Sequence, residues 1–406
     1  MTQQVERIPH RAPHPVIEVF LAFLRLGCTS FGGPVAHLAY FRTEFVERRV
    51  WLKDAAYADL VAFCQFLPGP ASSQVGIALG LSRAGLPGAF AAWAGFTAPS
   101  ALILVLFGLL VTNVGSAAKG PWLHGLAVVT VAVIAQALWG MGRSLCPDRQ
   151  RASVAAAATV VASLLPGALT QTAMILAGGV VGWLCLQPSA TLPHTPLPIA
   201  LGRRSGLLLL SIFAGLLLVL PLLADHGSYG WQLFNSFYRA GALVFGGGHV
   251  VLSLLQVAVV PPGWVSNEAF LAGYGATQAM PGPVSAFAGY LGAISAQQPN
   301  GWEGAAIALT AIFLPSFLLV PGGLPLWEAA RRYPAMQRAM LGINAAVVGL
   351  LLATFYQPVW AGGILSVRDF ALAVVAFLLL VFWKAPPWLV VVSCACAAGP
   401  IAGRFP

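Results

Sequence analysis

The sequence predicts an all-α polytopic membrane protein with two homologous halves. Of its 406 residues, 58% are apolar and only 8% are charged, whereas soluble domains carry roughly 25% charged residues. About 13 apolar runs are long enough to cross a bilayer as helices. Motifs of the first half also recur in the same order in the second half. Such ordered self-similarity indicates an internal duplication.

The candidate membrane spans can be placed from the apolar runs. They cover residues 16–36, 55–83 (broken at Pro68–Pro70), 87–112, 121–141, 152–166, 170–187, 206–224, 231–252, 267–296 (broken at Pro281–Pro283), 304–324, 337–356, 366–383 and 387–402. Run 152–166 is short, so it can form a hairpin with run 170–187. About seven spans separate Phe20 from its counterpart Phe234, and an odd number predicts inverted repeats. An even number would make the repeats parallel.

The internal repeat extends over several motifs with a nearly constant offset. At 214 residues, Phe20, Phe23, Arg25, Gly27, Phe31, Gly32 and Gly33 match Phe234, Phe237, Arg239, Gly241, Phe245, Gly246 and Gly247. At 213 residues, Trp51 matches Trp264 and the first Pro-Gly-Pro matches the second. At 216 residues, Gly88, Pro99 and Ser100 match Gly304, Pro315 and Ser316. The drift in offset is what loop insertions leave in an old duplication.

These matches divide the chain into four parts. We expect a polar N-terminal tail (1–15), a first repeat half (16–187), a loop plus linking helix (188–230) and a second repeat half (231–406). The tail lacks the apolar core and cleavage site of a signal peptide, so the first apolar run is expected to remain as an anchor.

The net charge of +9 is scattered between apolar runs rather than gathered on one soluble face. This distribution argues against nucleic-acid binding and favours positive loops on the cytoplasmic side, with the N-terminus cytoplasmic. Segment 42–53 has the wrong sign for this topology. The stretch from His37 to Trp51 is predicted to be an interfacial amphipathic helix, unless the broken span that follows is re-entrant.

Arg25 and Arg239 are predicted to lie near the middle of the bilayer at equivalent repeat positions. A charged side chain there is costly and is usually retained for a transport pathway, a sensor or a counter-ion. The planar donor fork of guanidinium matches oxyanions, so the pair predicts a site for a tetrahedral anion near the pseudo-symmetry axis. The alternative is a structural pair, for example Arg25 with Glu18 two turns away.

Two kinds of helix break follow these arginines in each half. Adjacent glycines and Pro-Gly-Pro both interrupt helices, and the helix that begins after a break presents free amides to an anion. The predicted substrate-binding residues are therefore Arg25, Arg239, Gly32, Gly33, Gly246, Gly247, Gly248, Gln65, Pro68, Gly69, Pro70, Ser72, Gln278, Pro281, Gly282, Pro283 and Ser285. The alternative is that the glycines only allow close helix packing.

Proton coupling would require a titrating group, and Asp59 and His249 are the candidates near the breaks, although each could instead be a helix cap. No nucleotide-binding loop or zinc motif is present in the sequence, and the six cysteines lack metal-ligand spacing. We therefore predict no cofactor, no metal and no enzymatic activity.

The paired motifs resemble those of the chromate ion transporter family in its long, two-repeat form. The matching pieces are Phe31-Gly32-Gly33-Pro34, Trp51-Leu52, Phe63-Cys64-Gln65-Phe66-Leu67-Pro68-Gly69-Pro70, Gly76, Phe245-Gly246-Gly247-Gly248 and Met280-Pro281-Gly282-Pro283. The resemblance covers nearly the whole chain. It implies a bacterial inner-membrane protein with two antiparallel halves that exports chromate, driven by the proton gradient or the membrane potential.

The expected function is thus secondary transport of a divalent tetrahedral oxyanion. The residues alone do not distinguish chromate from sulfate, which has the same shape and charge. A passive anion channel is a second alternative. A third, an intramembrane enzyme acting on a lipid phosphate, lacks a nucleophile or metal cluster near the arginines. The expected partners are the anion and the lipid bilayer, and a homodimer is left open.

Overall fold

The computed structural model describes residues 14–113, 121–165, 167–187, 202–245, 250–330 and 333–402. These residues form helices and no strand, which confirms the all-α prediction for this part of the chain. Five helical stretches are long and apolar enough to cross a membrane, namely Ala71–Thr112, Trp122–Leu145, Arg203–His226, Gly301–Trp327 and Pro334–Gly363. Several of the other predicted spans correspond to shorter helices, so the count of about 13 spans stays a prediction.

The first repeat begins with short helices and continues with long ones. Its helices are α1 (Pro15–Thr29), α2 (Gly33–Arg42, followed by a π-helical turn Thr43–Arg48), α3 (Asp54–Phe66), α4 (Ala71–Asn113), α5 (Pro121–Leu145), α6 (Arg149–Leu164) and α7 (Ala168–Cys185). The backbone leaves helical geometry inside α4 at Ala84 and Gly85, which matches the predicted boundary between spans 55–83 and 87–112. The predicted span 16–36 is interrupted, because α1 ends at Thr29 and a new helix begins at Gly33. This interruption lies at the glycine pair where the sequence predicted a helix break.

The linking helix α8 (Arg203–His226) connects the first repeat to the second. The second repeat contains α9 (Tyr229–Leu243), α10 (Val251–Val259), α11 (Asn267–Ala279), α12 (Phe287–Ala293, preceded by the turn Val284–Ala286), α13 (Gly301–Ala330), α14 (Pro334–Thr354), a π-helical turn Phe355–Trp360, α15 (Ala361–Gly363), α16 (Val367–Val381) and α17 (Pro387–Ala402). Within the predicted span 231–252, α9 ends at Leu243 and α10 begins at Val251, on either side of the glycine run at which the sequence predicted a helix break.

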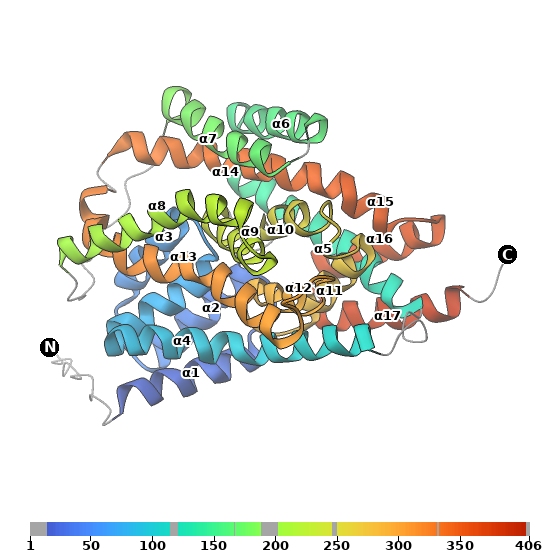
Figure 1. Cartoon of the computed structure of the whole chain (residues 1–406), viewed down its shortest axis with the longest axis horizontal. Helices are drawn as coiled ribbons and strands as arrows, with labels where there is room; N and C mark the ends of the chain where they lie inside the picture. The colour runs from blue at the N-terminus through green and yellow to red at the C-terminus, as the bar shows by residue number, and fades with distance from the viewer. Residues whose placement is uncertain are drawn as a thin grey trace, which may run out of the picture.

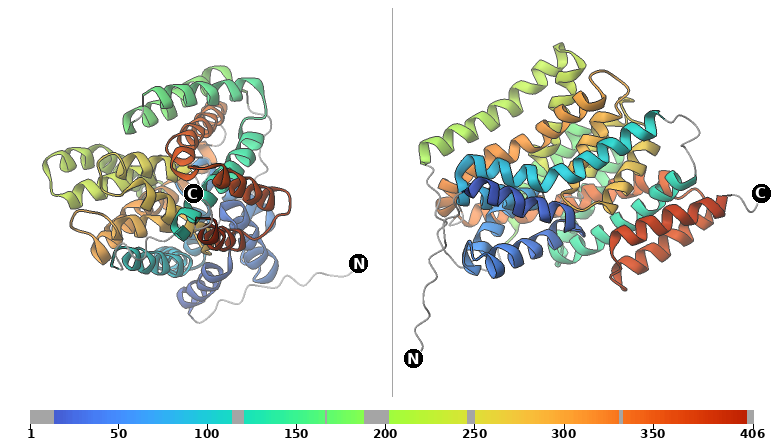
Figure 2. Two further views of the ribbon diagram at one scale, coloured as in Figure 1. Left: turned by 90° about the vertical axis from the view of Figure 1, so that its right-hand side faces the viewer. Right: turned by 90° about the horizontal axis from the view of Figure 1, so that it is seen from below.

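The two repeats exchange their terminal helix pairs. Helices α6 and α7 of the first repeat pack on α14 of the second, whereas α16 and α17 of the second pack on α5 of the first. Figure 1 shows both arrangements, with α6 and α7 above α14, and α16 and α17 beside α5. The helix α1 lies at the outside along α4, as the view from below shows (Figure 2). Because of this exchange, neither repeat buries its apolar surface alone.

Close helix approach depends on glycines at a few crossings. At the crossing of α7 and α14, a side chain on Gly342 would collide with the carbonyl oxygen of Gly178 and with the backbone of Gly182. Small residues at such crossings let backbones approach and gain van der Waals contact, which is the main attraction between helices in lipid.

We expect Gly342→Leu to destabilise the protein by about 3 kcal/mol or more, because overpacking adds to the loss of the α7–α14 contact. Thermal unfolding of the purified protein in detergent, followed by size-exclusion chromatography, measures this. The matched control is Gly215→Leu in α8, where an added Cβ meets nothing within 4 Å. Equal melting temperatures for the two variants would show that the glycine crossing between α7 and α14 does not contribute to the stability of the protein.

Candidate functional site

The two Pro-Gly-Pro segments each bind the opposite repeat through a backbone hydrogen bond. The amide of Gly69 donates to the carbonyl of Val244 at 2.6 Å, and the amide of Gly282 donates to the carbonyl of Ser30 at 3.0 Å. Gly69 and Gly282 are repeat equivalents, and so are Ser30 and Val244. We call these two contacts the break junctions. The two contacts are reciprocal. In each repeat, the residue that directly follows the arginine-bearing helix accepts a hydrogen bond from the Pro-Gly-Pro break of the other repeat.

The local sequence explains why glycine stands at both breaks. Proline on either side prevents a helix from continuing, and α3 ends at Phe66 while α4 begins at Ala71. The φ angles of Gly69 and Gly282 are +129° and +97°, which L-residues rarely adopt. A Cβ on Gly69 would lie 3.2 Å from the Ser316 hydroxyl, and one on Gly282 would lie 2.9 Å from the Ser100 hydroxyl.

Ser100 and Ser316 are themselves repeat equivalents, so each break packs on the same serine of the other repeat. These two serines are absent from the residues that the sequence predicted as a site. The signal that could have identified them is the Pro99-Ser100 match with Pro315-Ser316, which the repeat alignment contains.

Buried polar atoms without a hydrogen-bond partner are present near these breaks. Among the described residues they include Ser30 Oγ, Ser73 Oγ, Gln74 Oε1, Thr97 Oγ1, Gln278 Nε2 and Ser316 Oγ. A buried polar atom without a partner costs roughly 1–3 kcal/mol. Such groups are usually retained because water or a ligand completes their hydrogen bonds. The break junctions therefore carry neutral hydroxyl and amide groups that a polar ligand can contact.

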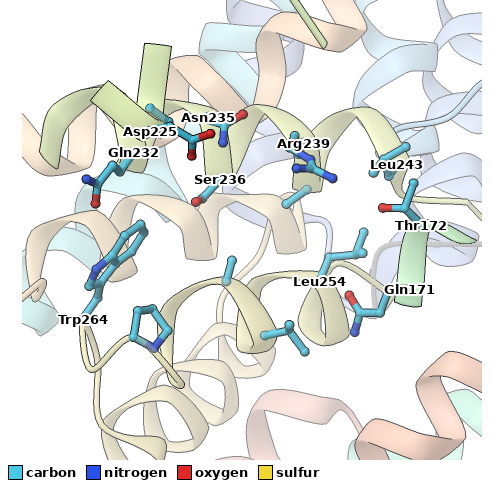
Figure 3. A pocket seen from close by; sticks show the side chains of 15 residues that line it. Gln171, Thr172, Asp225, Gln232, Asn235, Ser236, Arg239, Leu243, Leu254 and Trp264 are labelled. Atoms are coloured by element: carbon cyan, nitrogen blue, oxygen red, sulfur yellow. The ribbon is translucent and has the colours of Figure 1, made fainter. Parts of the chain in front are cut away.

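A cavity of about 480 Å³ lies between α7, α8, α9 and α10. We call it the α9 pocket. Its lining residues are Gln171, Thr172, Ala224, Asp225, Gln232, Asn235, Ser236, Arg239, Ala240, Leu243, Leu254, Val257, Ala258, Pro262 and Trp264. Figure 3 shows that the polar side chains from α9 point into it. Leu243 lines the pocket and precedes Val244, which accepts the hydrogen bond from Gly69. One wall of the pocket therefore continues into a break junction.

Arg239 occupies the middle of a polar stripe along α9. Gln232, Asn235, Ser236 and Arg239 are spaced three, four and seven residues apart, so they share one helix face. The guanidinium is half-buried, and the described residues make no hydrogen bond or ion pair with it. Asn235 Oδ1 and Gln171 Oε1 are buried and have no partner among the described residues. The stripe thus holds one positive charge and several polar groups that remain available to a ligand.

Arg25 has a different environment from its repeat equivalent. It lies on the exposed face of α1, opposite the buried Phe23, and it does not line the α9 pocket. The prediction that the two arginines share one pocket therefore does not hold for this cavity. Glu18, the suggested partner of Arg25, instead pairs with Arg83 at 2.9 Å and Arg49 at 3.6 Å.

The remaining predicted residues lie in several places. Gly32 and Gly33 have φ angles of +101° and +78° and form the turn between α1 and α2. Gln65 is exposed on α3, whereas Ser72 and Ser285 are buried directly after the two breaks. Pro68 and Pro281 are half-buried, and Pro70 and Pro283 are buried. Gly246, Gly247, Gly248 and His249 lie outside the described residues.

Asp59, the first candidate for proton coupling, is buried in α3 and accepts a hydrogen bond from Trp327 Nε1 of α13 at 3.4 Å. It thus contacts the other repeat but does not line the α9 pocket. In the described part of the chain, no group of three or more His, Cys, Asp or Glu side chains could hold a metal ion.

Comparison with known proteins identifies relatives along most of the chain. It is 28% identical to the chromate transport protein of Cupriavidus metallidurans over 84% of this chain and 82% of that protein. It is 28% identical to a probable chromate transport protein of Synechococcus elongatus over 81% of each chain. It is 27% identical to the chromate transport protein of Pseudomonas aeruginosa over 86% of this chain and 82% of that protein. No solved structure matches.

The family model of chromate transporters matches the chain twice, at residues 17–183 and 231–399. Both copies contain an arginine-bearing helix and a Pro-Gly-Pro break, and the segment between them contains the linking helix α8. Together with the apolar helices, these matches show a multi-pass membrane transport protein with two repeats. The chain therefore belongs to the chromate transporter family, in the form that carries two repeats.

Proposed function

We propose that this protein is a secondary transporter that exports chromate across the bacterial inner membrane and binds the anion in the α9 pocket. The observation that carries the proposal is Arg239, a half-buried guanidinium without an ion-pair partner among the described residues, in a cavity lined by amide and hydroxyl groups. An unpaired charge in a membrane protein normally has a functional ligand. A tetrahedral dianion satisfies both the charge and the donor fork of guanidinium.

The size and the chemistry of the pocket agree with a small oxyanion. Its volume of about 480 Å³ leaves room for the anion together with several waters, because one water takes about 30 Å³ in the liquid. Ser236 can donate a hydroxyl proton, and the side-chain amides of Gln232 and Asn235 can donate N–H groups. Leu243 of α9 and Leu254 of α10 lower the local polarity of the lining, which strengthens the attraction between the anion and Arg239.

The membrane potential can supply the driving force for export. Moving one charge through 100 mV is worth about 2.3 kcal/mol, so a dianion gains about 4.6 kcal/mol when it leaves a cell whose interior is negative. The inverted arrangement of the repeats and the cytoplasmic N-terminus belong to the same proposal, and the reciprocal break junctions support a pseudo-two-fold relation between the halves.

The sequence suggested that the glycine amides of the two breaks bind the anion, and we instead propose that they join the two repeats. Because Gly69 and Gly282 donate to carbonyl groups of the opposite repeat, their amides are engaged in this arrangement. We propose that the break junctions hold the repeats together and that the anion interacts with nearby hydroxyl groups, such as Ser72 and Ser285, as it passes. Arg25 is then proposed to act outside the α9 pocket.

Counterflow in proteoliposomes tests the proposed function. Vesicles loaded with unlabelled chromate should accumulate labelled chromate, because exchange through a carrier does not require net flux. An excess of external sulfate should compete if the pocket reads only shape and charge. Exchange that persists unchanged when the proton gradient and the membrane potential are collapsed, together with fast unsaturable flux, would indicate a passive channel. Absence of any chromate exchange would contradict the proposal.

A further inference from the structure

The α9 pocket contains a carboxylate as well as a guanidinium. Asp225 comes from the last turn of α8 and lines the pocket, and its side chain is exposed. Among the described lining residues, Asp225 and Arg239 are the two ionisable ones. Figure 3 shows Asp225 near Gln232 and Asn235, with Arg239 further along α9. No ion pair joins the two side chains in the described structure, so they face one cavity without neutralising each other.

This arrangement makes anion binding depend on the charge of Asp225. Opposite charges inside membrane proteins usually pair with one another, and here the guanidinium stays open to an external anion instead. An ionised carboxylate in the same cavity repels that anion, and the repulsion is doubled for a dianion because the Coulomb energy is proportional to charge. A proton on Asp225 removes this repulsion and leaves the attraction of Arg239 in place.

The other titratable groups on the elements around Asp225 are few in the described part of the chain. Helix α8 packs on α9 and α13. From α9, Arg239 faces the pocket and Tyr229 is buried, and the first turn of α13 carries Glu303. His226 is the neighbour of Asp225 on α8 itself. The pocket walls from α7 and α10 carry no charge among the described residues.

We propose that Asp225 is a proton-binding site that controls the affinity of the α9 pocket for divalent oxyanions. The proposal rests on the proposed function, since it assumes that Arg239 binds the anion. By linkage, the anion must raise proton affinity by the same factor by which the proton raises anion affinity. Asp225 belongs to the linking helix, which lies between the two segments matched by the family model. The proposed proton-binding site thus lies on a segment outside the two repeats, and it lines a pocket that is formed mainly by the second repeat.

Equilibrium binding of labelled sulfate and labelled chromate to the purified full chain tests this inference. We expect wild-type affinity to fall as the pH rises and Asp225 loses its proton. Asp225→Asn should bind about tenfold more tightly than wild type at high pH and equally well at low pH. The titration of the anion itself is common to both proteins and cancels in this ratio. Asp225→Glu should restore the wild-type profile.

Two controls separate this inference from the proposed function. Glu303→Gln removes an exposed carboxylate that does not line the pocket and should leave the ratio to wild type at one across the pH range. Arg239→Gln should abolish binding at every pH. If Asp225→Asn follows the wild-type profile while Arg239→Gln binds nothing, the inference is overturned and the proposed function stands. If wild type binds neither anion at any pH, both are overturned.

Discussion

Replacing Arg239 by alanine is expected to reduce chromate transport at least 100-fold. The charge in the α9 pocket comes from this guanidinium and from Asp225, which has the wrong sign for an anion. Truncating one member of a charge pair that is shielded from water costs about 2–5 kcal/mol, and about 2.7 kcal/mol already corresponds to 100-fold. Uptake of labelled chromate into proteoliposomes with matched amounts of protein measures the loss.

Arg25→Ala provides the matched control, because it removes the same residue from the equivalent position in the first repeat. Arg25 lies on the exposed face of α1, outside the α9 pocket, so we expect this variant to keep most of its transport and all of its anion binding. Normal transport by Arg239→Ala would remove the basis of the proposed site. Equal loss in both variants would mean that the two arginines act together and that the α9 pocket alone is not the site.

The sequence alone could not predict that Arg25 and Arg239 lie in different environments. The repeat alignment makes Arg25 and Arg239 equivalent, and equivalence suggests equal environments. The second repeat, however, has an additional neighbour, since α8 packs along α9 and Tyr238 donates a hydrogen bond to the Phe213 carbonyl of α8. In the first repeat the corresponding face of α1, with Leu21 and Arg25, is exposed. An element outside the duplication thus contributes one wall of the pocket.

Local chemistry, in contrast, was well predicted where proline and glycine decide the backbone. Several predicted spans begin and end within a few residues of the observed helices, as for α16 (Val367–Val381), predicted at 366–383. Spans 16–36 and 231–252 are each interrupted near the adjacent glycines at which the sequence predicted a break. Apolar content continues past Ser30 and past Val244, so hydropathy indicates one span, although the chain leaves helical geometry where each carbonyl accepts a hydrogen bond from the opposite repeat.

Ion pairs between residues far apart in the sequence also could not be predicted from residue spacing. Glu18 is well placed on α1 to reach Arg25 two turns away, yet it pairs with Arg83 and Arg49. Both cations also lie over the ring of Trp51, at 5.2 and 5.8 Å from its centroid. Glu18 and Arg83 lie 65 positions apart, and the packing of α1 on α4 brings them together.

Gly282→Leu is expected to abolish transport and to destabilise the protein by about 3 kcal/mol or more. At a φ of +97°, an L-residue costs roughly 1–2 kcal/mol. A side chain there would also crowd the Ser100 hydroxyl and the Phe96 carbonyl, both in the opposite repeat, and overpacking costs a further 1–3 kcal/mol or so. Gly69→Leu should behave alike. Thermal unfolding in detergent and chromate counterflow measure the two effects.

Gly301→Leu separates backbone strain from the loss of the break junction. Gly301 also has a positive φ, +55°, but an added Cβ there meets nothing within 4 Å, so this variant should lose about 1 kcal/mol and keep its transport. In a second comparison, Gly282→Ala combined with Ser100→Gly should recover part of the stability that Gly282→Ala loses, because Ser100 is the nearest obstacle. The Gly282 amide donates a hydrogen bond to the Ser30 carbonyl of the other repeat. If Gly282→Leu folds and exchanges chromate as well as Gly301→Leu does, the two halves stay joined without this junction. The proposed role of both breaks would then be wrong.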